Sequence, residues 1–467
     1  MSRLTTKAFW IFLGDGGVRL FGFFTSVYLA RTLGADQYGI IIIALSILGY
    51  AVWFSDLGLS TLGIRNMALP TEKRSFKPES VFWSKVVLSI IVLVLSIIVV
   101  SGFRFDNPDA SRVIYLFLLS LVPHALLLDW YYNGTQKFHI NTSARLLQAV
   151  CYFGLVIYFI TPDGITKVPL AYITSITVSA LVMFLFFKEK TVLKEYEKAL
   201  TKFREIVKAG FTLGSGTFFT QVVVLLPALV IGYFIGTTQA GWYGAAFKII
   251  LLVMLADRIL ITLLLPNLSR IWHEDRKKAQ MHLQHVLRWV LFISCTAVLI
   301  LYTSSDVIVE LIFGEEYAVS SDLLSILCLF LPFTFLNSIY MFGLIAFGDD
   351  DAYLRSTIKG GVVAMFLILF LTYYGGLKWA AVAVVLSEMV ITFSVYLEFR
   401  KHMYLKTQRP LLMFGLPMII LLFLPMSGYI VFPLSFLLLP ALYIILVFVF
   451  RAIEKNDIRW IKNRLFG

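Results

Sequence analysis

The sequence predicts an all-α polytopic membrane protein with about fourteen transmembrane helices. Hydrophobic residues make up 59% of the chain, charged residues only 15%, and the mean hydropathy is +0.85. Apolar stretches long enough to cross a bilayer recur from one end of the 467 residues to the other. Basic residues collect in the short segments between these stretches, as the topology signals of membrane proteins do.

The apolar stretches divide into fourteen expected spans. The first one is too long for the apolar part of a signal peptide, so we expect it to be retained. The last forty residues of this pattern would form one helix of about 60 Å, twice the bilayer core, and we therefore expect two helices there. The spans are 8–30, 38–64, 81–101, 112–132, 143–161, 168–187, 209–235, 242–266, 286–308, 322–346, 357–374, 377–399, 411–429 and 431–450.

The basic residues also predict the orientation. If the N-terminus is inside, thirty Lys and Arg fall in cytoplasmic segments and five in outer loops. This bias predicts that both termini are cytoplasmic. It also accounts for the net charge of +12 without nucleic acid as a partner.

A segment in the middle of the chain suggests how the spans are grouped. Residues 188–208 alternate Lys and Glu, which predicts an amphipathic helix on the cytoplasmic leaflet. Leu13-Gly-Asp-Gly16 returns as Leu213-Gly-Ser-Gly216, and Gln37-Tyr-Gly39 is echoed by Gly241-Trp-Tyr-Gly244, which together form a weak internal repeat. We therefore expect an N-lobe (1–187), the linker (188–208), a C-lobe (209–400), and a final helix pair with a basic tail (401–467). In transporters built from such repeats, the substrate site lies between the halves, so two pseudo-symmetric six-helix lobes around a central cavity are expected.

The first span carries two charges where hydrocarbon is expected. Asp15, Arg19, Gly22 and Ser26 share one face of a helix. A charge in the middle of a membrane costs about 2.5–3.5 kcal/mol on insertion scales, so such a stripe is expected to face protein or a wet cavity.

Other charges inside spans are candidates for the same cavity. We expected Lys85 and Arg288, near cytoplasmic ends, to extend to the membrane surface. The remaining candidates are Asp56, Lys248, Arg258 and Glu388.

Enzymatic motifs are weak in this chain. Gly14-Asp-Gly-Gly17 lacks the strand and spacing of a dinucleotide loop, and Asp349-Asp-Asp351 is expected to be a solvated turn. The cysteines and histidines show no metal-ligand spacing. We therefore expect no catalysis, no metal and no cofactor.

Several motifs together resemble one family. Arg31-Thr-Leu-Gly-Ala-Asp-Gln-Tyr-Gly39 resembles the R-x-L-G-x-x-x-Y-G turn of bacterial polysaccharide exporters. Further stretches follow in the same order: Asp56-Leu-Gly-Leu59, Asp129-Trp-Tyr-Tyr-Asn-Gly134 with Gln136-Lys-Phe138, Gly241-Trp-Tyr-Gly-Ala-Ala246 with Lys248, and Phe313-Gly-Glu-Glu-Tyr317. The family is the O-antigen and polysaccharide flippase (Wzx-type) branch of the multidrug/oligosaccharidyl-lipid/polysaccharide exporter superfamily.

The resemblance implies a flippase of the bacterial cytoplasmic (inner) membrane. Its substrate would be an undecaprenyl-diphosphate-linked oligosaccharide of O-antigen, capsule or exopolysaccharide, moved from the inner to the outer leaflet by alternating access. A glycan polymerase or chain-length protein would be a partner.

For that substrate we expect cations to bind the diphosphate. Arg19 is the first candidate because a guanidinium matches phosphate oxygens, and Arg31, Lys248 and Arg258 follow. The acids Asp15, Asp56 and Glu388 would balance charge or carry a coupling ion, H⁺ or Na⁺.

Two alternatives stay open at this stage. A cation-coupled multidrug exporter of the same superfamily would need a net acidic cavity. An integral-membrane glycan polymerase or ligase would carry a large outer loop, and every predicted outer loop here is short.

Overall fold

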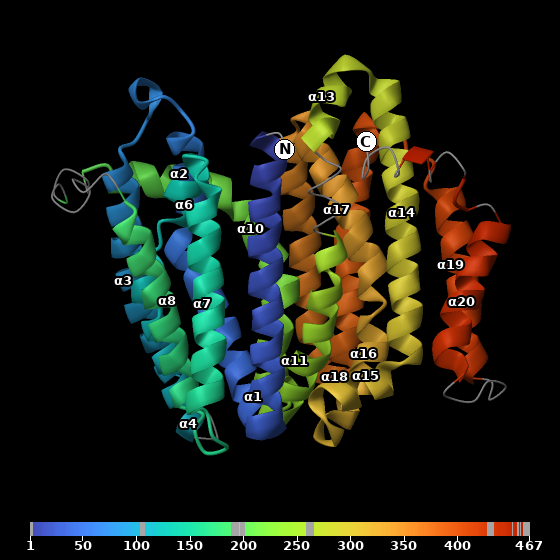
Figure 1. The fold of residues 1–467 in the computed structure, drawn as a ribbon, viewed down its shortest axis with the longest axis horizontal. Helices are drawn as coiled ribbons and strands as arrows, with labels where there is room; N and C mark the ends of the chain where they lie inside the picture. The colour runs from blue at the N-terminus through green and yellow to red at the C-terminus, as the bar shows by residue number, and fades with distance from the viewer. Residues whose placement is uncertain are drawn as a thin grey trace. The chain divides into compact units, whose positions relative to one another are not determined.

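The structure is a computed structural model that describes residues 3–102, 108–187, 196, 201–257, 266–426, 434–450, 452–454, 457 and 459–460. Within these ranges every regular element is a helix, which confirms the all-α prediction. The chain divides into two compact units, Met1–Gly244 and Ala245–Gly467 (Figure 1). The predicted lobes and linker stay a prediction. Of the linker, Phe203–Lys208 is the first part of a long helix.

The first unit begins with α1 (Arg3–Asp56), which folds back on itself (Figure 1). Its 54 residues would span about 80 Å as one helix, far more than a bilayer. Gly34 interrupts it with φ 76° and ψ 172°, a conformation that favours glycine. The Ser26 and Tyr38 hydroxyls meet at 2.5 Å across this break, although twelve residues of straight helix would separate them by about 18 Å. Gly34 therefore joins two spans into a helical hairpin.

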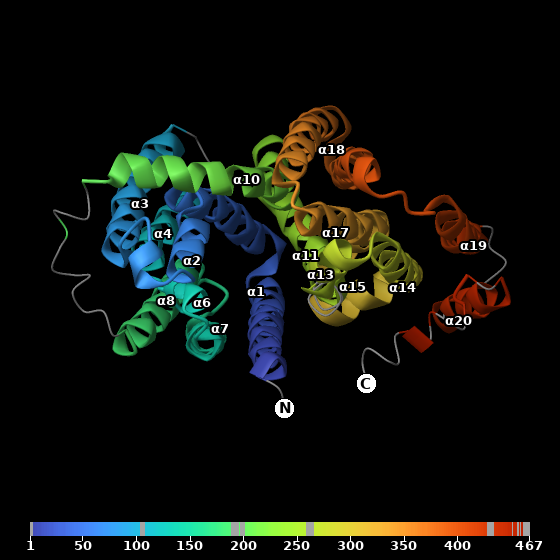
Figure 2. The same cartoon turned by 90° about the horizontal axis from the view of Figure 1, so that it is seen from above.

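The other helices of this unit pack around that hairpin (Figure 2). An aromatic core holds several of them, with the rings of Trp130, Tyr131 and Tyr132 buried. The elements are α2 (Leu59–Met67), the 3-10 turn η1 (Thr71–Lys73), α3 (Pro78–Ser101), α4 (Pro108–Leu119), α5 (Leu121–Ala125), α6 (Asp129–Gly134), α7 (Phe138–Phe159), α8 (Lys167–Leu185), α10 (Phe203–Phe234) and the start of α11 (Thr237–Val253).

The second unit contains a second helical hairpin, α18 (Asp350–His402), broken at Gly376 with φ 73°. The Asp349 carboxylate before its start lies 2.8 Å from His402 Nε2 at its end, and it also caps the helix by accepting from the Ala352 N–H. The acidic triplet that begins at Asp349 therefore helps to close this hairpin. The other elements are α13 (Pro266–Glu274), α14 (Arg276–Thr303), α15 (Ser305–Phe313), η3 (Glu315–Tyr317), α16 (Ala318–Leu327), α17 (Phe330–Phe347), α19 (Gln408–Met426) and α20 (Leu434–Val449).

Ten helices among the described residues are long and apolar enough to cross a membrane. Two of them are the hairpins, so each covers two predicted spans. The final pair, α19 and α20, lie side by side (Figure 2) and have shorter apolar stretches. The multispan prediction is confirmed, whereas the number fourteen is not.

One predicted span ends early. We expected a helix over 38–64, but α1 ends at Asp56, and α2 starts only at Leu59. Leu57 and Gly58 have positive φ angles of 40° and 80°, which end the helix. A side chain on Gly58 would overlap backbone atoms of Gly210 and Gly214 in α10. The chain breaks here because the backbones approach closely.

A second close approach lies at the other end of the same span. A methyl group on Gly39 would overlap the Thr237 carbonyl oxygen, and one on Gly241 would overlap the Ala35 carbonyl oxygen. Small residues allow this kind of contact between helices in membranes. The second half of α1 is therefore fixed at both ends by glycine contacts.

These contacts predict the effect of adding one methyl group. Gly39→Ala should destabilise the protein by about 1–3 kcal/mol or more, because the backbone it meets cannot move aside as a side chain can. Gly22→Ala, on the same helix, is the control, since nothing lies within 4 Å of its added methyl group. Thermal unfolding in detergent measures both, and equal midpoints for the two variants would contradict the packing argument.

Candidate functional site

A buried ion pair in the first unit joins α1 to α3. Lys85 Nζ lies 3.3 Å from the Asp56 carboxylate and donates to Ser60 Oγ at 2.9 Å. The Ser60 hydroxyl in turn donates to Asp56 at 2.5 Å. Only 7% of the Lys85 side chain and 26% of the Asp56 side chain are exposed. The three side chains therefore satisfy one another inside the unit.

Lys85 corrects one of our expectations. We expected its ammonium group to reach the membrane surface, but it is buried against Asp56. Lys85 lies two turns into α3. The break at Leu57–Gly58 places Ser60 at the start of α2, where the Lys85 ammonium group can reach its hydroxyl. Asp56 is therefore paired with Lys85 in this structure, and its predicted part in transport stays a prediction.

A second polar pair lies between α6 and α7. Arg145 Nη2 lies 2.9 Å from the Asp129 carboxylate. Near them His124 Nε2 lies 3.2 Å from the Tyr172 hydroxyl. Asp129 begins one of the family-like motifs, so the acid of that motif holds the adjacent helix by an ion pair.

In the second unit, two buried acids of the spans meet neutral side chains. Glu388 of α18 accepts a hydrogen bond from Asn337 Nδ2 at 3.1 Å, and the next residue, Ser338, donates to Asp257 at 2.7 Å. Glu388 and Asp257 are 5% and 7% exposed. Two adjacent polar residues of α17 therefore bind two buried carboxylates.

The predicted cations are placed less completely. Arg19 and Arg31 are exposed on the first half of α1, and Lys248 of α11 is half-buried. Twelve helical residues separate Arg19 from Arg31, about 18 Å along the axis. The two residues therefore lie at different depths of the first span. Arg258 and the side chain of Asp15 lie outside the described residues.

Two large aromatic side chains of the spans, Trp53 and Tyr243, have structural roles. Trp53 Nε1 donates to Thr217 Oγ1 at 2.9 Å, and its ring lies 4.8 Å from that of Phe218. Tyr243 is 1% exposed. Trp53 joins α1 to α10, and the Tyr243 side chain on α11 is buried.

The tail forms a cluster that our sequence analysis missed. Asp457 is fully buried, and its carboxylate binds His285 Nδ1 and, at 2.8 Å, Arg288 Nη1 of α14. The Trp460 ring stacks on His285 at 5.5 Å. We expected Arg288 to extend to the membrane surface, but this ion pair holds it. A single acid in a basic tail, about 170 residues from its partners, gives no local sequence signal.

The fold and these contacts can now be compared with known proteins. The family model described as "Polysaccharide biosynthesis protein" matches residues 4–272, more than half of the chain. The chain belongs to this family, which confirms the resemblance drawn from its motifs.

Individual relatives agree with that assignment. A protein of Escherichia coli K12 named "Putative O-antigen transporter" is 20% identical over 386 residues, covering 81% of this chain and 92% of its own length. The fold is similar to that of a lipid II flippase, MurJ, in an inward closed conformation, with a TM-score of 0.74 and 15% identity over 96% of this chain and 99% of that one. An inward-facing multidrug resistance transporter of the MATE family in the MOP superfamily has a TM-score of 0.67 and 16% identity over 82% and 94%.

Breaking the Asp56–Lys85 pair from one side should destabilise the protein. Lys85→Met leaves the Asp56 charge among buried groups, at a cost of about 3 kcal/mol. Adding Asp56→Asn removes that charge and should recover much of the loss. Thermal unfolding of the two variants measures the difference.

The control for this pair is Lys73→Met, because Lys73 is exposed in the neighbouring turn. Its midpoint should stay within error of the parent. If the double variant were no more stable than Lys85→Met, the charge pairing would not be the cause.

The tail cluster predicts a dependence on the charge of Asp457. Burial raises the pKa of this carboxyl, but hydrogen bonds from His285, the Glu454 N–H and Arg288 outweigh it and hold the pKa below its usual range. The free energy with which the Asp457 carboxylate holds the tail is therefore fully present above the usual Asp pKa of about 3.9. It is lost as the pH falls through the lower pKa that this group has in the folded protein. At neutral pH, Asp457→Asn imitates that loss.

Hydrogen exchange of the Glu454 N–H, which donates to Asp457 at 2.7 Å, reports this docking. The variant should exchange at least about tenfold faster, since hydrogen bonds to a charged group contribute about 1.5–3 kcal/mol. Glu310→Gln, at an exposed site on α15, is the matched control. Unchanged exchange in Asp457→Asn would show that the carboxylate does not hold the tail.

Proposed function

We propose that this protein is a flippase for a lipid-linked oligosaccharide, moving the glycan from the cytoplasmic to the outer leaflet by alternating access. The observation that carries the proposal is the family match over residues 4–272, on a multispan fold shared with a lipid II flippase over 96% of this chain. The O-antigen transporter named above supports a surface glycan as the cargo.

The chemistry of such a substrate accounts for the charges on the spans. We infer that the carrier is undecaprenyl diphosphate, whose tail stays in the bilayer while two negative charges and the sugars cross. An exposed guanidinium on a membrane helix, such as Arg19, suits phosphate oxygens. Because Arg19 and Arg31 are about 18 Å apart along α1, they would contact the diphosphate in successive positions rather than together.

The membrane potential supplies a direction. Each charge that crosses the field contributes about 2.3 kcal/mol per 100 mV. Two negative charges moving outward across an inside-negative membrane are therefore favoured by roughly 4.6 kcal/mol per 100 mV. An H⁺ or Na⁺ gradient can add to this but is not required by the energetics.

If a proton is coupled, Glu388 is a better carrier than Asp56. Asp56 is neutralised by Lys85, and protonation would leave that ammonium without its counter-charge. Glu388 accepts from an amide, which can bind either form of a carboxyl group.

A flipping assay with Arg19→Ala and Arg19→Lys tests the diphosphate role. A charge-assisted contact contributes about 1.5–3 kcal/mol. Its loss in Arg19→Ala should therefore slow flipping about 10-fold to 100-fold, and Arg19→Lys should slow it less. Leu20→Ala is the control, because this neighbour is an exposed apolar residue. Parent rates in both Arg19 variants, at equal protein level, would reject the role.

Removal of the protein from cells tests the function as a whole. A strain without this protein should accumulate lipid-linked glycan on the inner leaflet and lose the surface polymer. If it instead became sensitive to cationic drugs while its surface glycan stayed intact, the multidrug alternative would replace this proposal.

A further inference from the structure

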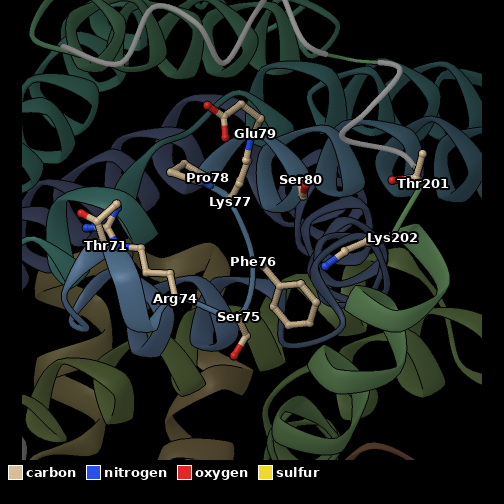
Figure 3. Close-up of a pocket in the computed structure, with 10 residues that line it drawn as sticks. All are labelled: Thr71, Arg74, Ser75, Phe76, Lys77, Pro78, Glu79, Ser80, Thr201 and Lys202. Atoms are coloured by element: carbon tan, nitrogen blue, oxygen red, sulfur yellow. The ribbon is translucent and has the colours of Figure 1, made fainter.

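The first unit carries a basic pocket of about 440 Å³ beside the start of α3 (Figure 3). Three basic side chains line it, Arg74, Lys77 and Lys202, with one acid, Glu79. Lys202, from the segment before α10, points toward the Phe76 ring and the start of α3 (Figure 3). Two segments more than 120 residues apart thus supply positive charge to one hollow.

The second unit carries a basic pocket of the same volume, about 440 Å³, beside the first turns of α14. Arg288, Lys406 and Arg409 line it, again with one acid, Glu454. Arg288 is held by the tail, whereas Lys406 and Arg409 are exposed and come from the segment that enters α19. The balance of three bases to one acid is therefore repeated.

The two pockets occupy corresponding places in the chain. α3 covers the third predicted span and α14 the ninth, which is the third of the second lobe. The second wall of each pocket comes from the segment after a lobe's sixth predicted span. In the first unit this segment enters α10, and in the second unit it enters α19. Both third spans begin on the predicted cytoplasmic side, so each pocket lies at that surface of its own unit.

One basic segment in each unit is fixed by an amide side chain. In the first unit, buried Asn66 accepts from the Ser75 and Phe76 N–H groups and donates to the Phe76 carbonyl. In the second, Gln284 accepts from the Lys406 N–H at 3.2 Å and donates to its carbonyl at 3.0 Å. The backbone next to Arg74 and Lys77, and that of Lys406, is therefore held to the fold.

Exposed apolar side chains lie on the helix beside each pocket, soon after Arg409 on α19 and, on α3, from Ile90, ten residues after the last α3 residue that lines the pocket. Leu412 and Leu416 are three and seven residues after Arg409 on the same face of α19, and they are 58% and 50% exposed. On α3, an exposed apolar stripe includes Ile90, Val94 and Ile98. A ligand with a negative head and acyl chains fits this arrangement, whereas a soluble anion would leave the apolar part unused.

We propose that each basic pocket binds the phosphate of an anionic phospholipid, such as phosphatidylglycerol, of the cytoplasmic leaflet. Basic pockets beside spans on that side attract anionic head groups. The presence of two similar pockets favours an abundant membrane lipid over a single transported molecule. The lipids would anchor the third span of each unit, whatever the flippase carries.

Native mass spectrometry of the full chain in detergent tests this with phosphatidylglycerol and with phosphatidylcholine of the same acyl chains. The parent should bind phosphatidylglycerol more tightly. Two double variants each remove two charges from one pocket, Lys77→Gln/Lys202→Gln from the first and Lys406→Gln/Arg409→Gln from the second. Each should weaken the affinity of its own site about 30-fold, because each charge removed lowers the affinity about fivefold. The control Lys73→Gln/Lys277→Gln removes two exposed charges near the pockets that do not line them.

Each contrary outcome has a definite meaning. Unchanged binding in both pocket variants, or an equal loss in the control variant, overturns the proposal. Competition by soluble glycerol 3-phosphate at equal concentration overturns the lipid assignment, as does binding of undecaprenyl diphosphate in place of phosphatidylglycerol. Because binding is measured without transport, failure of the flipping assay leaves this result unaffected.

Discussion

Burial of charge within membrane-spanning helices is the constraint on which the first unit depends. A hydrocarbon environment offers no hydrogen bonds, so a charged side chain there needs protein partners. Asp56, Ser60 and Lys85 meet this need together at the point where α1 ends and α2 begins. The positive φ angles of Leu57 and Gly58 that end the helix also create the geometry of the pair. Backbone break and ion pair therefore form one structural unit.

The family-like motifs are explained mainly by backbone requirements. Gly39 and Gly241 allow two chain segments to touch, and Gly314 adopts a φ of 93° at the turn before Tyr317. The aromatic residues after Asp129 fill the core of the first unit. In this chain, these motifs specify how the helices pack. They do not by themselves mark residues that contact a substrate.

Sequence patterns could predict the spans because apolar length and loop charge are local properties. They could not predict the partner of Lys85, because 29 residues separate it from Asp56. A lysine near the end of a span looks the same in the sequence whether it extends to the membrane surface or pairs with a buried acid. The end of α1 at Asp56 was missed for a related reason: only the approach of α10 to Gly58 requires a break there. The tail cluster joins residues about 170 positions apart. Local patterns carry no information about such pairs.

Two carboxyl groups of the spans are bound in different ways. Asp56 in the first unit is neutralised by Lys85, and an ion pair fixes the charge of both members. Glu388 in the second unit accepts a hydrogen bond from the neutral amide of Asn337. An amide can turn its donor or its acceptor toward a carboxyl group, so it can bind that group with or without its proton. A change of proton at Glu388 therefore leaves no partner charge unbalanced, whereas protonation of Asp56 would leave the Lys85 ammonium group without its counter-charge.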